Sequence, residues 1–217
     1  MKTISIWLCS TEVPCWNFTV EHKKKIEDSL NNTKVIVCHD KQTFLDSLTE
    51  ADTVFVCFFK QEWLEQATNL RLIITPAAGR EFIQLNLPDN VSIEHSTFHG
   101  KLIGETVIGM MLAHTRGILL SYKLQSTSHW PRKELDSQMR LLKGSRITIL
   151  GLGNLGNWIG RIVKPFEVDI YGIKRNISSI PDYFTDSDRI LSIDDLDSVP
   201  PETDFLILCL PKSEVTD

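Results

Sequence analysis

The residues of this chain best suited to chemistry form a glycine-rich run, Gly151-Leu152-Gly153-Asn154-Leu155-Gly156, with the spacing G-x-G-x-x-G. It follows an apolar stretch, Arg146–Leu150, that is typical of a strand, and it precedes a helical stretch, Asn157–Val163. In that context the first glycine permits a tight turn, the second lets backbone N–H groups approach a pyrophosphate, and the third lets helix and strand pack closely. The helix dipole then faces the anion. We therefore predict that Gly151, Gly153, Asn154, Leu155 and Gly156 bind a dinucleotide; a turn without a ligand is the alternative.

The next apolar stretch, Val168–Ile173, predicts which dinucleotide is bound. An NAD-specific site would carry Asp or Glu after this strand, to bind the ribose 2′-hydroxyl. This chain has Lys174, Arg175 and Asn176 there. A guanidinium can bind a 2′-phosphate with two charge-assisted hydrogen bonds, whereas a carboxylate would repel it. These three residues favour NADP(H), with NAD(H) possible; a solvated strand end is the alternative.

A further apolar stretch, Asp204–Leu210, predicts a strand that ends beside the same site. Ligands of open α/β sheets bind outside the carboxyl ends of the strands. Leu210, Pro211 and Thr216 are therefore expected to border the cofactor crevice.

The segments that must position this site alternate between strands and helices. Uniformly apolar strands separated by helices predict parallel sheets covered on both faces. We expect an α/β fold with two doubly wound lobes: a flavodoxin-like lobe over residues 1–100 and an incomplete Rossmann lobe over residues 127–217. In the first lobe the expected strands are 4–9, 34–38, 53–59, 70–75 and 90–94, and the expected helices are 20–30, 41–48 and 61–68.

Residues 101–126 connect the two expected lobes. Apolar residues recur at three- and four-residue spacing from Lys101 to about Gln125, with no internal proline. We predict one long helix, long enough to cross between lobes. The polar stretch 126–138, which contains Pro131, is expected to be a loop.

Composition excludes several classes of partner. The chain has 217 residues and a net charge of −5, so it offers no electrostatic reason to expect nucleic acid or an anionic membrane. It has no signal-peptide layout and no apolar run long enough to span a bilayer. The five cysteines include no C-x-x-C pair, and no metal site is predicted. A reduced, cytoplasmic setting is expected.

Several motifs, taken in order, resemble those of the D-isomer-specific 2-hydroxyacid dehydrogenases. The resemblance covers the whole sequence and rests on their joint order and spacing. The motifs are Thr75-Pro76-Ala77-Ala78-Gly79-Arg80-Glu81, then Gly104-Glu105 with Arg116 and Trp130, then Leu142-Lys143-Gly144 before the glycine-rich run, and finally Thr203-Asp204-Phe205 leading to Leu210-Pro211 and Thr216.

The resemblance implies a two-lobed oxidoreductase that transfers hydride between NAD(P)H and a small 2-keto or 2-hydroxy acid. It implies that backbone N–H groups of Ala78 and Gly79 hold the substrate carboxylate, and that the helix from Lys101 forms a homodimer contact. Lys174 stands where the family commonly has Asp, which resembles its NADP-preferring members.

The family's catalytic Arg, Glu and acid/base His all lie downstream of the segment that matches Leu210–Thr216. We therefore assign no catalytic residue within this sequence, and interpret it as an amino-terminal portion of a longer enzyme whose catalytic segment lies beyond Asp217. If the 217 residues are complete, the alternative is a non-catalytic nucleotide-binding module or pseudo-enzyme. His95 and His99 are the plausible local proton donors, although surface or hinge histidines explain them more simply. The sequence leaves the substrate and the reaction direction open.

Overall fold

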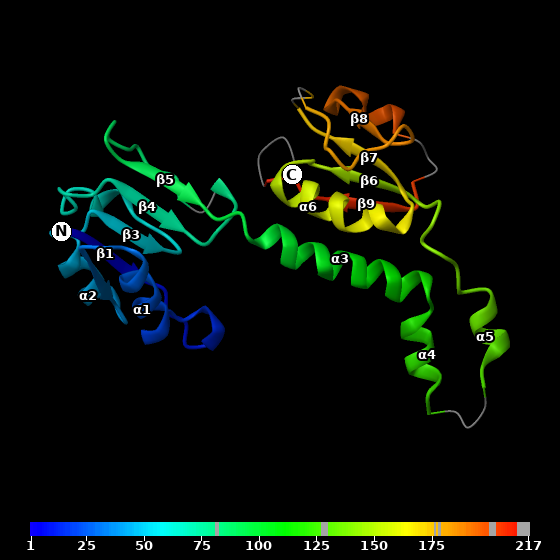
Figure 1. The fold of residues 1–217 in the computed structure, drawn as a ribbon, viewed down its shortest axis with the longest axis horizontal. Coiled ribbons are helices and arrows are strands. Elements are labelled where there is room, and N and C mark those ends of the chain that lie inside the picture. Colours follow the sequence, from blue (N-terminus) through cyan, green and yellow to red (C-terminus); the bar gives the residue numbers. More distant parts are fainter. Residues whose placement is uncertain (81–82, 127–129, 176, 178, 200–202, 212–217) are drawn as a thin grey trace. The chain divides into compact units, whose positions relative to one another are not determined.

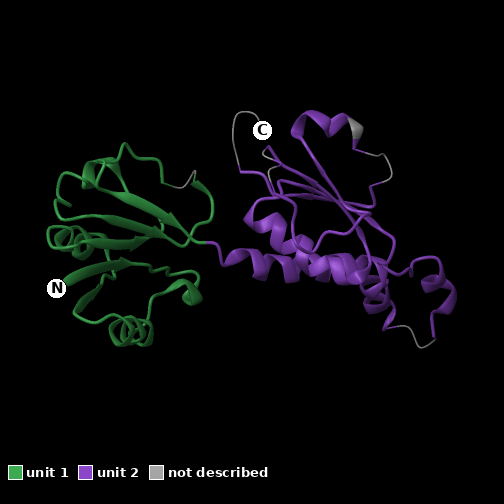
Figure 2. Cartoon of the chain, turned by 45° about the horizontal axis from the view of Figure 1, so that its top comes forward, with its two compact units in different colours: residues 1–96 green, residues 97–217 purple. Residues whose placement is uncertain are grey.

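The structure is a computed structural model that describes residues 1–80, 83–126, 130–175, 177, 179–199 and 203–211. The chain divides into two compact units, residues 1–96 and 97–217 (Figure 2). Each unit is built around its own parallel sheet.

The first unit contains a five-stranded parallel sheet with the order β2-β1-β3-β4-β5 (Figure 1). Its strands are β1 (Lys2–Trp7), β2 (Thr33–Val37), β3 (Thr53–Val56), β4 (Leu72–Thr75) and β5 (Ser92–His95). This is the strand order of flavodoxin-like doubly wound folds. The prediction of an α/β fold with a flavodoxin-like first lobe is thus confirmed.

The helices of this unit are α1 (Val20–Ser29) and α2 (Lys41–Ser47). Asp40 caps α2 by accepting a hydrogen bond from Thr43 N at 2.8 Å, and the Thr43 hydrogen bonds hold the pKa of that carboxyl below its ordinary value. Phe44 of α2 is fully buried against the sheet. The helix predicted over residues 61–68 is wrong: the structure has a 3-10 turn, η2 (Gln61–Trp63), which buries Trp63 in the core. A second 3-10 turn is η1 (Pro14–Trp16).

The second unit contains a four-stranded parallel sheet with the order β8-β7-β6-β9 (Figure 1). Its strands are β6 (Arg146–Leu150), β7 (Asp169–Ile173), β8 (Arg189–Leu191) and β9 (Phe205–Leu208). The order reproduces four of the roughly six strands of a Rossmann sheet, with β6 as the first strand of the fold. The prediction of a Rossmann-type sheet in the second lobe is therefore confirmed.

The helices of this unit are α3 (His99–Thr115), α4 (Ile118–Leu124), α5 (Arg132–Asp136) and α6 (Asn154–Val163), with 3-10 turns η4 (Lys164–Phe166) and η5 (Ile193–Ser198). The prediction of one helix from Lys101 to Gln125 is wrong. Gly117 has φ +59°, a left-handed conformation that ends α3 and begins α4. The stretch predicted as a loop, residues 126–138, contains the short helix α5.

Helices α3 and α6 lie side by side on one face of this sheet (Figure 1). Gly100 and Gly104, one turn apart on α3, allow this close approach. A Cβ on Gly100 would lie 2.5 Å from Trp158 Cδ1, and one on Gly104 would lie 2.5 Å from Ile162 Cδ1. Met111 of α3 and Ile159 of α6 then share the buried core with β6.

Within the described part of the chain, no helix is both long and apolar enough to cross a membrane.

Candidate dinucleotide-binding site

The glycine-rich turn begins where β6 ends and is held by the neighbouring strands. The N–H groups of Gly151 and Leu152 both donate to the carbonyl of Ile173, at 2.9 and 3.0 Å. Gly151 has φ +99°, and a Cβ there would lie 2.6 Å from the Cys209 carbonyl oxygen. Because a side chain would be strained and would overlap backbone, this position requires glycine.

The other two glycines of the run differ sharply in their surroundings. A Cβ on Gly156 would overlap the Gly151 carbonyl oxygen and lie 2.9 Å from Ile149 Cγ2, so Gly156 lets α6 pack tightly on β6. A Cβ on Gly153 would meet nothing within 4 Å. The absence of a side chain at Gly153 therefore leaves open space at the start of α6.

The start of α6 is a site for an anion. Gly153 is the N-cap residue, and no side chain caps the helix there. The first N–H groups of a helix have no intrahelical partner, and the helix dipole places partial positive charge at this end. Open space, unpaired N–H donors and positive potential thus coincide at Gly153.

A pocket of about 260 Å³ adjoins this helix end, between the glycine turn and the loop after β7. Its lining residues are Leu152, Gly153, Asn154, Asn157, Lys174, Ser179, Ile180 and Pro181. The Lys174 ammonium donates to the Ser179 carbonyl at 2.7 Å and lies 3.4 Å from the Ser179 hydroxyl oxygen. The pocket therefore has a fixed positive charge on one side and the helix N-terminus on the other.

Tyr183 contacts α6 and one of the residues that line this pocket, Asn157. Its hydroxyl donates to Asn157 Oδ1 at 3.0 Å, and its ring lies against Gly160 of α6. Burial raises the pKa of Tyr183 above its ordinary value. The phenol therefore stays protonated at neutral pH and can donate this hydrogen bond to the side chain of Asn157, a residue that lines the pocket.

The other residues predicted to bind the cofactor lie at the surface, beside the glycine turn, or outside the described residues. Arg175 is exposed beside Lys174. Leu210 Cδ2 would lie 3.1 Å from a Cβ on Gly151, so Leu210 lies beside the turn as its place after β9 predicts, and Pro211 follows it at the surface. Asn176 and Thr216 lie outside the described residues.

Sequence reasoning missed Ser179 and Asn157. Asn157 is three residues after Asn154 on α6, so the helical period was the signal that could have placed both beside the pocket. Ser179 lies in an irregular loop, and the sequence contains no pattern that predicts its contact with Lys174.

The predicted substrate residues Ala78 and Gly79 lie in a loop of the first unit, directly after β4. The base of this loop is ordered: Ala77 N donates to Thr75 Oγ1 at 3.2 Å, and Ser96 N donates to the Ala77 carbonyl at 3.3 Å. Ala78 is exposed and Gly79 is half-buried. Their backbone groups are thus near the surface, at the carboxyl end of the sheet where ligands of this fold bind.

Two histidines, His95 of the first unit and His99 of the second, each have an imidazole nitrogen without a partner among the residues described. Nδ1 of His95 and Nδ1 of His99 are buried and accept or donate no hydrogen bond among the residues described. His95 ends β5 and His99 begins α3. The described residues contain no group of three His, Cys, Asp or Glu side chains that could hold a metal ion.

Comparison with known proteins identifies the family. Residues 108–217 match the family described as "D-isomer specific 2-hydroxyacid dehydrogenase, NAD binding domain". The chain is 24% identical to D-3-phosphoglycerate dehydrogenase of Methanocaldococcus jannaschii, over 88% of this chain and 37% of that protein. It is 24% identical to glyoxylate reductase of Pyrococcus furiosus, over 81% of this chain and 54% of that protein. It therefore spans between about a third and just over half of these relatives' length.

A solved structure extends the comparison to the fold. The NADPH-dependent glyoxylate/hydroxypyruvate reductase of Sinorhizobium meliloti, in complex with NADP and sulfate, superposes with a TM-score of 0.74 at 19% identity. The match covers 100% of this chain and 64% of that one. Because the family model matches residues 108–217, just over half of the 217 residues, the chain belongs to the D-isomer-specific 2-hydroxyacid dehydrogenase family.

Proposed function

We propose that the second unit binds NADP(H) at the Gly151–Gly156 turn, in an oxidoreductase that transfers hydride between this nucleotide and a small 2-keto or 2-hydroxy acid. The observation that carries the proposal is the open position at Gly153. Gly151 and Gly156 are required by the protein's own packing, but nothing in the described protein explains glycine at Gly153. A pyrophosphate on the α6 N-terminus explains it, because a Cβ would occupy the path of the phosphate.

The preference for NADP(H) rests on Lys174 and Arg175. Lys174 lines the pocket beside the glycine turn, and Arg175 is exposed next to it. A ribose 2′-phosphate at this place would gain two cations and the Ser179 hydroxyl as partners. NAD(H), which offers a 2′-hydroxyl there, would find no carboxylate among the pocket residues.

The nucleotide and the protein chain would contribute different parts of the reaction. The nicotinamide, when bound, supplies or accepts the hydride, and the chain positions it and the acid. The N–H groups of Ala78 and Gly79 are proposed to hold the substrate carboxylate. We also propose that the protein is cytoplasmic. We further propose that it forms a homodimer through the helices that follow Lys101, because the side chains of Leu119 and Tyr122 on α4 are 65% and 74% exposed.

The test has two parts. Calorimetric titration of the chain with NADPH and NADH measures cofactor binding, and binding of NADPH at least about tenfold tighter is expected. Steady-state absorbance at 340 nm with glyoxylate, hydroxypyruvate or pyruvate then measures turnover by a polypeptide extended past Asp217. Nucleotide binding without turnover of any 2-keto acid by the extended protein would leave a non-catalytic nucleotide-binding module. Absence of binding would overturn the proposal altogether.

A further inference from the structure

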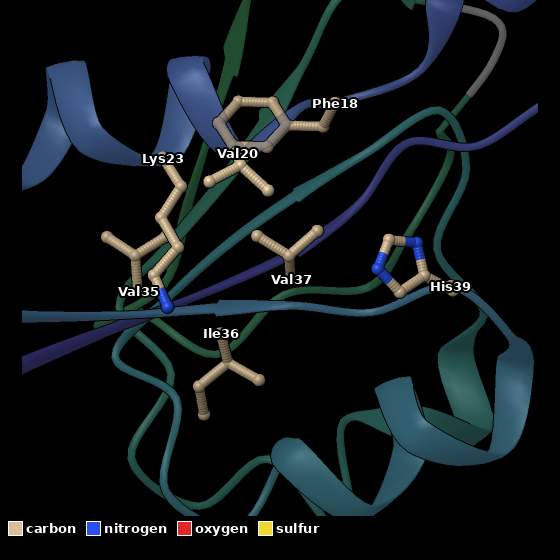
Figure 3. A pocket seen from close by; sticks show the side chains of 7 residues that line it. All are labelled: Phe18, Val20, Lys23, Val35, Ile36, Val37 and His39. Atoms are coloured by element: carbon tan, nitrogen blue, oxygen red, sulfur yellow. The ribbon is translucent and has the colours of Figure 1, made fainter.

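The first unit contains a hollow far from the candidate substrate loop along the sheet, at its opposite edge strand. A cavity of about 460 Å³ lies between α1 and β2, and its lining residues are Phe18, Val20, Lys23, Val35, Ile36, Val37 and His39 (Figure 3). Cavities of roughly 300–1,000 Å³ are the size class of small-molecule sites. The nucleotide and substrate residues proposed above include none of this lining.

The cavity lies where α1 covers β2 without burying any of its own residues against the strand. On the opposite face, α2 buries Phe44 completely. Helix α1 buries none of its residues, and Val20 at its start is 82% exposed. Val35 and Val37 face α1, since Ile36 between them packs against the core that contains Phe44 of α2 on the other face, and both valines line the cavity with Val20 and Lys23. An apolar floor therefore lies under a helix that does not fill the space above it.

The roof of the cavity is fixed in place before any ligand binds. Thr19 N donates to His22 Nδ1 at 3.1 Å, and His22 N donates to Thr19 Oγ1 at 3.4 Å, forming a capping box. The Phe18 ring lies 5.2 Å from the His22 ring, and Phe18 N donates to the Leu8 carbonyl at 2.9 Å. These contacts hold the Phe18 ring over β2.

The polar groups of the cavity lie at its two ends. Figure 3 shows Lys23 Nζ beside Val35 and the His39 ring at the opposite end of the strand, with Val37 between them. The ion pair of Lys23 is a long one, 3.7 Å to Glu27 Oε1, and both side chains are well exposed. Such a pair contributes little, so the ammonium can exchange Glu27 for another anion at small cost.

We propose that this hollow binds a small aliphatic monocarboxylate, with its carboxylate on Lys23 Nζ and its hydrocarbon chain along Val35 and Val37 beneath Phe18. A single ammonium at one end of an apolar channel suits one carboxylate and a short chain. Phosphate-rich ligands need several convergent cations or N–H donors, which the lining does not provide.

The test uses the whole 217-residue chain and hexanoate as the probe, followed by ¹H–¹⁵N correlation spectra. Saturable shifts that centre on Phe18, Lys23, Val37 and His39 are expected. Lys23→Gln should weaken binding about tenfold, because the carboxylate loses its charged donor. Lys24→Gln is the matched control: it removes the same charge one position along α1, outside the lining, and should change the affinity less than twofold.

A second variant and a neutral probe make the result decisive. Val20→Asp places a negative charge in the cavity lining, which would repel the carboxylate of hexanoate and should also weaken its binding. Hexanol has no charge for Lys23 to bind, so it should bind to the unmodified chain at least about tenfold more weakly than hexanoate. The proposal is overturned if hexanoate produces no saturable shifts, if hexanol binds equally well, or if Lys24→Gln weakens binding as much as Lys23→Gln. A concentration-dependent dimer that Val20→Asp abolishes would assign the hollow to a second copy, and would also overturn it.

Discussion

A Cβ on Gly151 would lie only 2.6 Å from the carbonyl oxygen of Cys209, so the turn after β6 passes close to the end of β9. Two neighbouring parallel strands thus end together where the order of the sheet changes direction, β7-β6 on one side and β9 on the other. In open α/β sheets this switch point is where ligands bind. This close approach therefore marks the place in the sheet where the candidate site lies.

Substitutions of two glycines in the same turn should separate folding from binding. Gly151→Ala is expected to destabilise the chain by about 1–3 kcal/mol or more, because it combines a positive φ with backbone overlap. Gly153→Ala should leave the thermal midpoint unchanged, since its backbone is extended and a Cβ there meets nothing, yet should weaken NADPH binding at least about tenfold. Thermal melts by circular dichroism and calorimetric titration measure the two effects. Unimpaired binding by the Gly153 variant would remove the pyrophosphate from this turn.

The strands and helices that could be predicted from the sequence are those whose pattern is visible within a short stretch of neighbouring residues. The strand Arg146–Leu150 was predicted to the residue, because a buried parallel strand is a continuous apolar run followed by glycine. The three-residue strand β8 was not predicted, since Arg189–Leu191 is too short to show any period. The break at Gly117 was missed for a related reason. Apolar spacing continues across it, and the left-handed backbone that divides α3 from α4 leaves no mark on that spacing.

The same distinction applies to the candidate site. The glycine turn is local, so its three glycines could be assigned roles from their spacing alone. The contact of Lys174 with Ser179 depends on how an irregular loop returns to α6, which no periodicity records. Likewise, the cavity between α1 and β2 exists because α1 buries none of its side chains. A sequence pattern can predict that an apolar side chain is buried, but it does not predict an unfilled space beside a helix.

Lys174 should control which nucleotide binds. Lys174→Ala is expected to weaken NADPH binding at least about tenfold and to leave NADH binding within twofold, because only NADPH carries the 2′-phosphate. Arg175→Ala should act in the same direction. Lys143→Ala is a suitable control, since Lys143 is an exposed lysine paired with Glu167 at 2.6 Å and lies outside the pocket. Equal affinities of the unmodified chain for NADH and NADPH would contradict this role for Lys174.

Asp188 should make the second unit sensitive to acid. Burial by itself raises the pKa of this carboxyl, but hydrogen bonds from Lys164, Thr185 and Ile170 outweigh burial and lower the pKa below its ordinary value of 3.8. A group with a lowered folded-state pKa stabilises the protein above its unfolded-state pKa, and this contribution disappears as the pH falls through the folded-state value. The urea midpoint should therefore drop more steeply below about pH 4 in the unmodified chain than in Asp188→Asn.

Removal of the Asp188 carboxylate should lower the free energy of unfolding at neutral pH more than removal of an exposed carboxylate does. The Asp188 side chain is fully buried and that of Lys164 is 15% exposed, with Nζ 2.7 Å from Asp188 Oδ2. Asp188→Ala removes the charged partner of the ammonium and leaves it the Val168 carbonyl at 2.9 Å, so the variant should lose about 3 kcal/mol of unfolding free energy. Asp182→Ala, which breaks the exposed pair with Arg161, should cost at most about 1 kcal/mol. Similar losses for both variants would show that burial of the Lys164–Asp188 pair is unimportant.

Strand β9 should make the isolated 217-residue chain associate with itself. It is an outer strand of the sheet that the described residues form, and Leu206 and Leu208 of this strand are 59% and 67% exposed. An outer strand with unpaired backbone groups and apolar side chains is a template for another chain. Light scattering after size exclusion should show mass that rises with protein concentration, and Leu208→Lys should reduce that rise. Leu119→Lys, on α4, should instead prevent the proposed homodimer and leave the open-ended association in place. If Leu208→Lys leaves the concentration dependence unchanged, β9 is not the surface through which the chains associate.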